Sequence, residues 1–284
     1  MDGVDDHVER LDLDEVRAPS LIASEHLHRY ELAARLCRGM RVADVCCGTG
    51  YGTRLLADGG ADVVGIDSSE KAIAEAAGLG IRTEVADALE YLERPSLPDE
   101  IEAVVMFEGL EHLPDVDRAV VALRGLAANG VRLAISIPNS KLLGEEDNPF
   151  HETDFDHERA AATLRGLADE VVVLGQYLAE GSLIRGEAGG GELAAAPVLE
   201  GRAEPEFAGH YIGLAGFGNA ANELSTRMLL SAAPAHRSYM LELEAANARM
   251  WDRVTELEER LARIEESPLY RASAPVRALL RRRG

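Results

Sequence analysis

A short apolar stretch followed by a glycine-rich turn constrains the fold of this chain more than any other feature. The apolar residues within 42–45 indicate a short buried strand, and glycines then alternate at Gly48, Gly50 and Gly52. A helix-like run follows over residues 53–58. Strand, tight glycine turn and helix form the first half of a nucleotide-binding βαβ unit, in which glycine lets the backbone approach a ligand closely.

Apolar segments and helix-like segments continue to alternate after this unit. Further strands are expected at residues 61–67, 81–86, 101–107, 131–137, 170–175 and 210–215. Helices are expected at residues 21–37, 69–77, 115–128 and 157–169. This order predicts an α/β Rossmann-like fold with a seven-stranded, mostly parallel sheet and a ligand outside the carboxyl ends of its strands.

The spacing of the glycines favours one class of ligand. The dinucleotide fingerprint is G-x-G-x-x-G, whereas here the glycines alternate and Asp44 stands near the end of the first strand. A carboxylate at that point suits an ammonium group better than a phosphate, which argues against a nicotinamide oxidoreductase. The stretch resembles motif I of the class I S-adenosylmethionine (SAM)-dependent methyltransferases, with Cys46 at the family's usual first glycine.

The resemblance implies a set of cofactor contacts and a domain boundary. In that family the acidic residue and the glycine loop hold the methionine end of SAM, while Asp67 accepts hydrogen bonds from the ribose and Asp87-Ala88 reads the adenine edge. The last strand is antiparallel, so the catalytic domain is expected over residues 21–232. The cofactor-binding residues expected on this basis are Tyr30, Asp44, Cys46, Gly48, Gly50, Asp67, Ser68, Asp87, Ala88 and Phe107.

The helix at residues 21–37 carries the pattern E-H-x-x-R-Y, from Glu25 to Tyr30. His26 and Tyr30 are four residues apart and therefore share a helical face. The pattern resembles bacterial methyltransferases in which this helix covers the cofactor and the tyrosine packs over SAM. The alternative is a surface helix with one buried tyrosine.

A cluster of ionisable residues directly follows the fourth strand. Glu108, Glu111 and His112 have the spacing i, i+3, i+4, which places side chains on one face of a helical turn. Two carboxylates and an imidazole make a divalent-metal site with open positions, and a metal would lower the pKa of a bound acceptor hydroxyl. Oxygen ligands favour Mg²⁺, and the imidazole leaves Mn²⁺ open.

The E-x-x-E-H pattern resembles metal-dependent small-RNA 3′-end 2′-O-methyltransferases and ubiquinone-pathway O-methyltransferases. In the former a distal histidine completes the site, and His151 is the candidate here. The expected metal ligands are therefore Glu108, Glu111, His112 and His151, and the expected catalytic residues are His112, Glu111 and His151. Without a metal, His112 alone would act as general base or order the loop.

The charge of the chain restricts its partners. It has 284 residues, 50 acidic against 29 basic, and a formal net charge of −21, which opposes binding to nucleic-acid phosphates. The E-H-x-x-R-Y helix, the N-P-F-H loop and the C-terminal arm resemble bacterial methyltransferases of glycan and polysaccharide assembly. This predicts O-methylation of a sugar hydroxyl on an oligosaccharide or lipid-linked glycan. The alternatives are a metal-independent O-methyltransferase of a phenolic or polyketide metabolite and a non-catalytic SAM-binding scaffold.

The two ends of the chain differ from the expected catalytic domain. Residues 1–20 form an acidic lead, and residues 238–266 carry apolar heptads with one Asn at a core position, which predicts a coiled coil and a homodimer. Residues 267–284 form a basic tail, predicted either to touch a membrane surface or an acidic partner or to remain solvated. No run of about 18 uninterrupted apolar residues occurs, so the expected location is cytoplasmic, with peripheral contact at the inner membrane through the tail as the variant.

Overall fold

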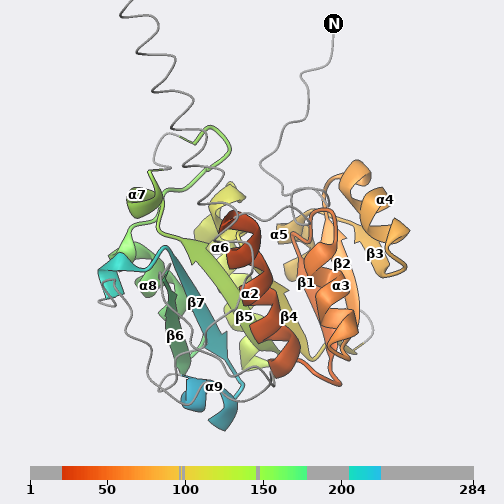
Figure 1. Ribbon diagram of the computed structural model, residues 1–284. Helices are drawn as coiled ribbons and strands as arrows, with labels where there is room; N and C mark the ends of the chain where they lie inside the picture. The colour runs from red at the N-terminus through yellow and green to blue at the C-terminus, as the bar shows by residue number, and fades with distance from the viewer. Residues whose placement is uncertain (1–20, 96, 98–99, 145–147, 178–204, 225–284) are drawn as a thin grey trace, which may run out of the picture. The chain divides into compact units, whose positions relative to one another are not determined.

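The computed structural model describes residues 21–95, 97, 100–144, 148–177 and 205–224. These residues contain a seven-stranded sheet in the order β3-β2-β1-β4-β5-β7-β6 (Figure 1). The strands are β1 (Arg41–Val45), β2 (Asp62–Asp67), β3 (Arg82–Val85), β4 (Ala103–Met106), β5 (Arg132–Pro138), β6 (Val171–Gln176) and β7 (His210–Ala215). β1 to β5 pair in parallel, whereas β7 runs antiparallel to both β5 and β6. The predicted Rossmann-like sheet with a reversed last strand is confirmed.

Helices cover both faces of the sheet. They are α2 (Leu21–Leu36), α3 (Tyr51–Asp58), α4 (Glu70–Gly78), α5 (Ala88–Leu92), α6 (Val116–Ala128), α7 (Ser140–Leu143), α8 (His157–Arg165) and α9 (Asn219–Leu224), with 3₁₀ turns η2 (Leu110–His112) and η3 (Pro205–Phe207). One apolar core packs α2, α3 and α9 against the sheet, and the other packs α5, α6 and α8 against it. Figure 1 shows α2 and α3 together on the face nearer the viewer.

The strand sequences explain why both faces are covered. Val42 and Val105 belong to the core under α2, whereas Ala43 and Val104 belong to the opposite core. Successive side chains of a strand point to opposite faces, so an apolar run without polar interruption buries both. The central strand β4 is buried along its whole length. Because β1 to β5 pair in parallel, their carboxyl ends meet at one rim of the sheet.

Side-chain caps begin several of the helices at that rim. The Ser69 hydroxyl accepts a hydrogen bond from the Ala72 N–H at the start of α4, and the Asp87 carboxylate accepts one from the Glu90 N–H at the start of α5. α3 begins differently, because its first flanking residue is Gly50 at φ 81°. This left-handed conformation favours glycine and turns the chain from β1 into α3.

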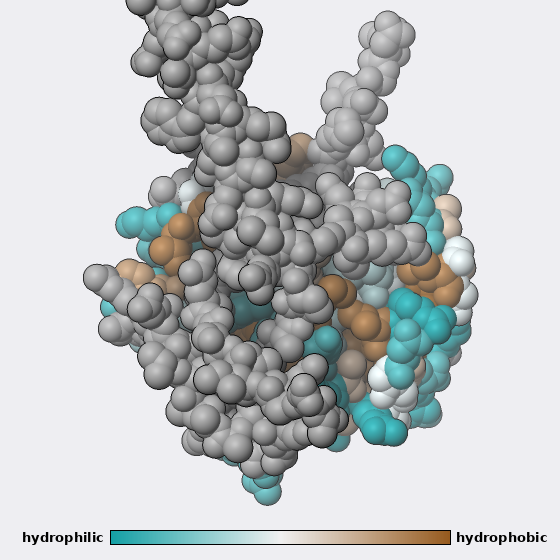
Figure 2. All heavy atoms as spheres, in the orientation of Figure 1, coloured by the Kyte–Doolittle hydropathy of each residue, from teal (hydrophilic) through white to brown (hydrophobic). Residues whose placement is uncertain are grey.

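The surface of the described domain is mixed in character. Figure 2 shows hydrophilic residues over much of the visible described surface, with hydrophobic residues in smaller groups between them. No helix in the described part of the chain is long and apolar enough to cross a membrane. The acidic lead, the predicted coiled coil at 238–266 and the basic tail at 267–284 lie outside the described residues, so those assignments remain predictions.

Candidate active site

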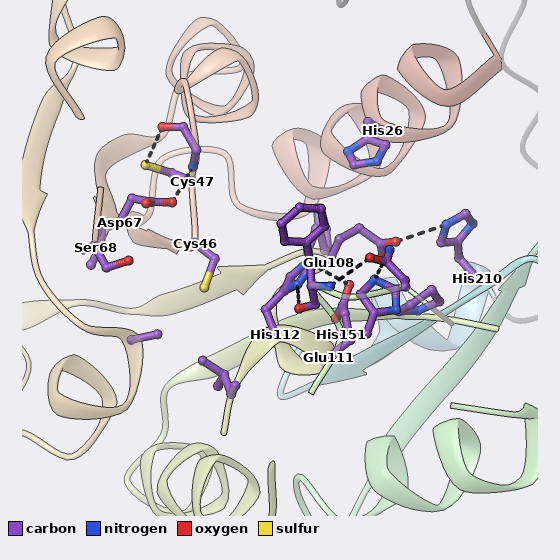
Figure 3. A pocket seen from close by; sticks show the side chains of 18 of the residues that line it. His26, Cys46, Cys47, Asp67, Ser68, Glu108, Glu111, His112, His151 and His210 are labelled. Carbon is purple, nitrogen blue, oxygen red and sulfur yellow. Dashed lines mark hydrogen bonds and ion pairs between the residues drawn. The ribbon is translucent and has the colours of Figure 1, made fainter. Parts of the chain in front are cut away.

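A cavity of about 870 Å³ lies at the rim where the parallel strands end (Figure 3). One end is lined by residues of the glycine loop and of the turns after β2 and β3. The other end is lined by α2, by the segments after β4 and β5, and by the start of β7. We call these the donor end and the acceptor end. Most of the predicted cofactor residues line the cavity, whereas Gly50 and Asp44 are not among its lining residues; those that line it are Tyr30, Cys46, Gly48, Asp67, Ser68, Asp87, Ala88 and Phe107.

Asp67 ties two parts of the donor end together. Its Oδ2 accepts a hydrogen bond from the Gly48 N–H at 2.9 Å, and its Oδ1 accepts one from the Ser69 N–H at 2.9 Å. The carboxylate lines the cavity and is only 6% exposed. A carboxylate at the end of the second strand of a Rossmann-like sheet is well placed for ribose hydroxyls. The glycine loop and β2 are thereby fixed relative to each other.

Asp44 lies behind the cavity wall rather than in it. Its side chain is fully buried, and it accepts hydrogen bonds from Thr53 Oγ1 at 2.5 Å and from the Tyr30 hydroxyl at 3.2 Å. Asp44 is absent from the residues that line the cavity within the described chain. Burial raises the pKa of Asp44 to about 7, although the Thr53 and Tyr30 hydrogen bonds oppose the shift. Any effect of Asp44 on a cofactor therefore acts through its charge and through Tyr30.

Cys46 occupies an unusual backbone conformation. It has φ 61°, in the left-handed region that favours glycine, at the position where the resembled family has a glycine. Its side chain lies against Gly109, because a Cβ added at Gly109 would come within 3.1 Å of the Cys46 Cβ and Sγ. The missing side chain at Gly109 thus makes room for the extra one at Cys46.

Tyr30 lines the cavity and packs against the start of α3. Its ring makes edge contacts with Tyr51, at 5.7 Å between centroids, and with Phe107, at 5.0 Å. The ring also lies directly over Gly52 of α3, where a Cβ would stand only 2.0 Å from the ring. The contact of Tyr30 with α3 is therefore built on a position without a side chain, and the packing of Tyr30 over SAM stays a prediction.

Replacing Gly52 with alanine is expected to displace the Tyr30 ring. We expect a loss of about 1–3 kcal/mol in the free energy of unfolding, the usual cost of overpacking, together with weaker binding of SAM. Urea unfolding and calorimetric titration with SAM measure the two effects. Gly78→Ala is the matched control, because a Cβ there meets nothing within 4 Å. An unchanged unfolding midpoint in Gly52→Ala would contradict this packing.

Glu111, His112 and His151 meet at the acceptor end. We call them the donor cluster because each could donate an electron pair to a metal ion, a sense of the word separate from the donor end of the cavity. One potential ligand atom from each lies within 4.8 Å of those of the other two, and Figure 3 shows the side chains gathered together. The two imidazole rings meet edge to face at 5.1 Å. One carboxylate oxygen and two imidazole nitrogens suit a divalent transition ion such as Mn²⁺. The predicted meeting of His151 with the Glu111-His112 turn is present.

The backbone contacts of this region fix the cluster. The Glu152 and Thr153 N–H groups donate to the Glu111 carbonyl at 2.8 and 3.1 Å. His112 Nδ1 lies 2.9 Å from the Phe150 carbonyl. A carbonyl only accepts, so Nδ1 carries the proton and the Nε2 of a neutral His112 has its lone pair available. The loop that carries His151 is thus hydrogen-bonded to the turn that carries the other two residues.

Glu108 departs from the predicted site. The prediction placed Glu108 on one helical face with Glu111 and His112, but the helical turn in the structure covers only Leu110–His112. Glu108 has φ 51°, in the left-handed region, and Gly109 has φ −131°. This conformation separates the Glu108 side chain from the donor cluster, of which it is not a member.

Glu108 instead joins a set of buried polar residues at the acceptor end that the sequence analysis did not assign to the site. Its Oε2 lies 3.1 Å from His210 Nε2, and its Oε1 lies 3.8 Å from Arg29 Nη2. His210 Nδ1 lies 3.6 Å from Glu25 Oε1. The Arg29 guanidinium donates to Gln176 Oε1 at 2.8 Å. The E-H-x-x-R-Y pattern, which contains Glu25 and Arg29, is a sequence signal for part of this network.

His26 of α2 lines the acceptor end of the cavity. Its Nδ1 lies 2.7 Å from the Tyr51 hydroxyl, and Figure 3 shows its ring on the helix above Glu108. Burial, reinforced by the Arg29 guanidinium, lowers the pKa of His26 to about 3. His26 is therefore neutral at physiological pH and supplies a polar but uncharged wall.

Comparison of the sequence with known protein families identifies the family of this chain. Residues 19–171, more than half of the chain, match the family described as "Methyltransferase domain". The chain belongs to this methyltransferase family. The match covers β1 to β5 and the first residue of β6, and therefore includes the glycine loop, Asp67 and the donor cluster.

Individual relatives match parts of the methyltransferase. A protein of Mycolicibacterium smegmatis named as a probable S-adenosylmethionine-dependent methyltransferase is 32% identical over 148 residues, which are 50% of this chain and 56% of that protein. A ubiquinone biosynthesis O-methyltransferase of Methylococcus capsulatus is 38% identical over 112 residues, 37% of this chain and 46% of that protein. The chain spans about half the length of the curated relatives it matches.

A solved structure gives a weaker match. The crystal structure of a SAM-dependent methyltransferase from Archaeoglobus fulgidus is 21% identical in sequence, covers 72% of this chain and 99% of its own, and has a TM-score of 0.49. The family assignment of the methyltransferase therefore rests on the sequence match over residues 19–171.

Proposed function

We propose that this methyltransferase transfers the methyl group of SAM to a hydroxyl oxygen, assisted by a divalent metal ion held by Glu111, His112 and His151. The observation that carries the proposal is the donor cluster at the acceptor end of a cavity whose donor end holds the glycine loop. A carboxylate and two imidazoles suit a divalent ion, and an ion bound there would lower the pKa of an acceptor hydroxyl.

The protein residues would then divide the work between the two ends. In the transfer the acceptor oxygen forms a bond to the methyl carbon while the carbon–sulfur bond breaks, and S-adenosylhomocysteine leaves. Asp67 and the glycine loop would hold the donor, and Tyr30 and Phe107 would close over it. Positioning both partners in line supplies much of the rate increase in such reactions.

The hydroxyl proton must leave the acceptor during the transfer. The Nε2 of His112, with its lone pair available, is the group of the donor cluster that would take it if no ion were bound. An ion at the same nitrogen would instead lower the pKa of the hydroxyl, so that its proton would pass to water. The metal-free alternative, with His112 as general base, therefore differs from our proposal in one measurable respect, the effect of chelation.

We propose a sugar hydroxyl of an oligosaccharide or lipid-linked glycan as the acceptor. The acceptor end presents hydrogen-bonding side chains, among them Glu25, His26, Asn148 and His210. Among the described lining residues, Phe150 is the one Phe, Tyr or Trp side chain at this end, because Tyr30, Tyr51 and Phe107 lie toward the donor end. Polar groups of this kind suit a hydroxyl-rich molecule. The strongly acidic composition fits a neutral acceptor better than a polyanion.

A phenolic acceptor is the second candidate. It is favoured by the relatives named as ubiquinone biosynthesis O-methyltransferases, which match 32–42% of this chain at 31–38% identity. A screen that pairs glycan acceptors with catechols, using methyl-labelled SAM, distinguishes the two. Label on the sugar alone supports the first candidate, and label on the catechol alone supports the second.

Chelation tests the metal directly. We expect EDTA to lower the rate of methyl transfer at least a hundredfold and Mn²⁺ to restore it, while SAM still binds in calorimetry. His112→Ala should give a similar loss that Mn²⁺ does not restore. Asp169→Ala is the control, because this residue pairs with Arg124 on the surface. Full activity in EDTA would contradict the metal. SAM binding without turnover, unaffected by Glu111→Ala, would favour the scaffold alternative.

A further inference from the structure

The carboxylate of Glu108 is held by residues of three other elements. Its Oε1 accepts a hydrogen bond from the Ser136 hydroxyl at 2.6 Å, and its Oε2 lies 3.1 Å from His210 Nε2. The Ser136 oxygen also accepts the Glu108 backbone N–H at 3.1 Å. Arg29 approaches from α2. Both the backbone and the side chain of Glu108 are therefore fixed, in a direction that keeps the carboxylate out of the donor cluster.

The residues that hold Glu108 are themselves buried and connected. Arg29 is 1% exposed and donates to Gln176 Oε1, and Gln176 Nε2 donates at 3.0 Å to the Glu25 carbonyl. His210 is 6% exposed and sits in β7 opposite Gln176 of β6. Moving the Glu108 carboxylate into the donor cluster would leave the Arg29 charge buried without its counter-ion, which is costly.

Glu108 nevertheless faces the cavity. Its side chain is 15% exposed, and the residue lines the acceptor end. Burial opposes its charge, but Arg29 and His210 outweigh burial and hold the pKa of Glu108 well below its usual value. An ionised carboxylate accepts hydrogen bonds at about four lone-pair positions and donates none. Positions therefore remain for a donor from a bound molecule.

We propose that Glu108 is not a metal ligand in this methyltransferase but the hydrogen-bond acceptor for a second hydroxyl of the acceptor molecule. This inference rests on the proposed function and names the class of acceptor: a molecule with neighbouring hydroxyls, one on the donor cluster and the next on Glu108. An acceptor with a single hydroxyl leaves the carboxylate without that partner. An anionic group at the same place would be repelled.

The first arm of the test measures metal binding without turnover. Mn²⁺ is titrated into the full-length protein, and free Mn²⁺ is followed by electron paramagnetic resonance. Glu108→Gln is expected to change the Mn²⁺ dissociation constant less than threefold, and Glu111→Gln to raise it at least tenfold. Glu75→Gln, at an exposed position on α4, is the matched control. Equal weakening by Glu108→Gln and Glu111→Gln would overturn the reassignment of Glu108.

The second arm measures the preference for neighbouring hydroxyls. Cis-cyclohexane-1,2-diol and cyclohexanol are compared by saturation-transfer NMR on protein loaded with S-adenosylhomocysteine, in EDTA so that no metal contributes. We expect the diol to bind at least tenfold more tightly than the alcohol to the wild type and to Glu75→Gln. The preference should fall below threefold in Glu108→Gln. Equal binding of the two alcohols to the wild type, or binding of neither, would overturn the inference.

The two arms also separate this inference from the proposed function. A wild-type protein that binds no Mn²⁺ contradicts the metal in the proposed function, whereas the diol preference still decides the role of Glu108. Conversely, a metal-dependent transfer reaction with no diol preference leaves the proposed function standing and refutes the role of Glu108.

Discussion

Replacing Arg29 with methionine is expected to lower the free energy of unfolding by about 3–5 kcal/mol, the usual cost of removing one partner from a buried ion pair. The guanidinium is fully buried and lies between Glu108 and Gln176. Methionine has a similar length, so little cavity is created. The loss should come from the Glu108 carboxylate, which would keep only its contacts with His210 and Ser136.

Urea unfolding measures this loss, and two further variants identify its cause. Arg35→Met, at an exposed position of the same helix, controls for the change of residue type and is expected to lie within about 0.5 kcal/mol of the wild type. The double variant Arg29→Met/Glu108→Gln should recover part of the stability, because the charge left behind is removed as well. A double variant less stable than Arg29→Met alone would contradict an electrostatic origin.

Asp44→Asn is expected to make the protein more stable and a poorer binder of SAM. The pKa of Asp44 is about 7 in the folded protein against 3.8 for the free residue. The folded state therefore binds the proton more tightly, and stability falls as the pH rises from about 4 through 7. Linkage puts the full penalty above pH 7 at roughly 4 kcal/mol. Asparagine keeps the shape and carries no charge, so this pH-dependent loss should disappear.

The weaker SAM binding expected of Asp44→Asn has the same cause, the loss of the Asp44 charge. SAM carries a sulfonium and an ammonium group, and a buried carboxylate behind the cavity wall attracts both. We expect Asp44→Asn to weaken SAM binding at least tenfold, and wild-type affinity to rise with pH up to about 7 while that of the variant stays flat. Urea unfolding at pH 5 and pH 8 and calorimetry with SAM measure both effects. Asp58→Asn, at an exposed position at the end of α3, is the control. Unchanged SAM affinity would contradict a role for Asp44 in the donor end.

The sheet could be predicted because local signals and long-range order agree in this part of the chain. Apolar runs marked the strands, and the glycines marked the turn that the positive φ of Gly50 now explains. Asp67 and Asp87 could be placed because Asp67 is the last residue of β2 and Asp87 lies just after β3. The short helices α5, α7 and α9 escaped prediction, because segments of four to six residues carry too little periodicity.

The acceptor end was harder to predict, for two physical reasons. The prediction from the i, i+3, i+4 spacing of Glu108, Glu111 and His112 required a regular helical turn. The left-handed backbone at Glu108 is incompatible with such a turn. The partners of Glu108 come from distant parts of the chain: Arg29 precedes it by 79 positions and His210 follows it by 102. Spacing within a motif cannot reveal contacts of this kind, which depend on the order of strands in the sheet.

The reversed direction of β7 has a consequence for which parts of the cavity can be altered separately. Because β7 runs against β5, it contributes its opening residue, His210, to the rim where its neighbours finish. The peptide that leads into β7 therefore reaches the acceptor side, while the turns after β1, β2 and β3 build the donor side. A substitution at the start of β7 can therefore alter the acceptor side while leaving the turns of the donor side unchanged.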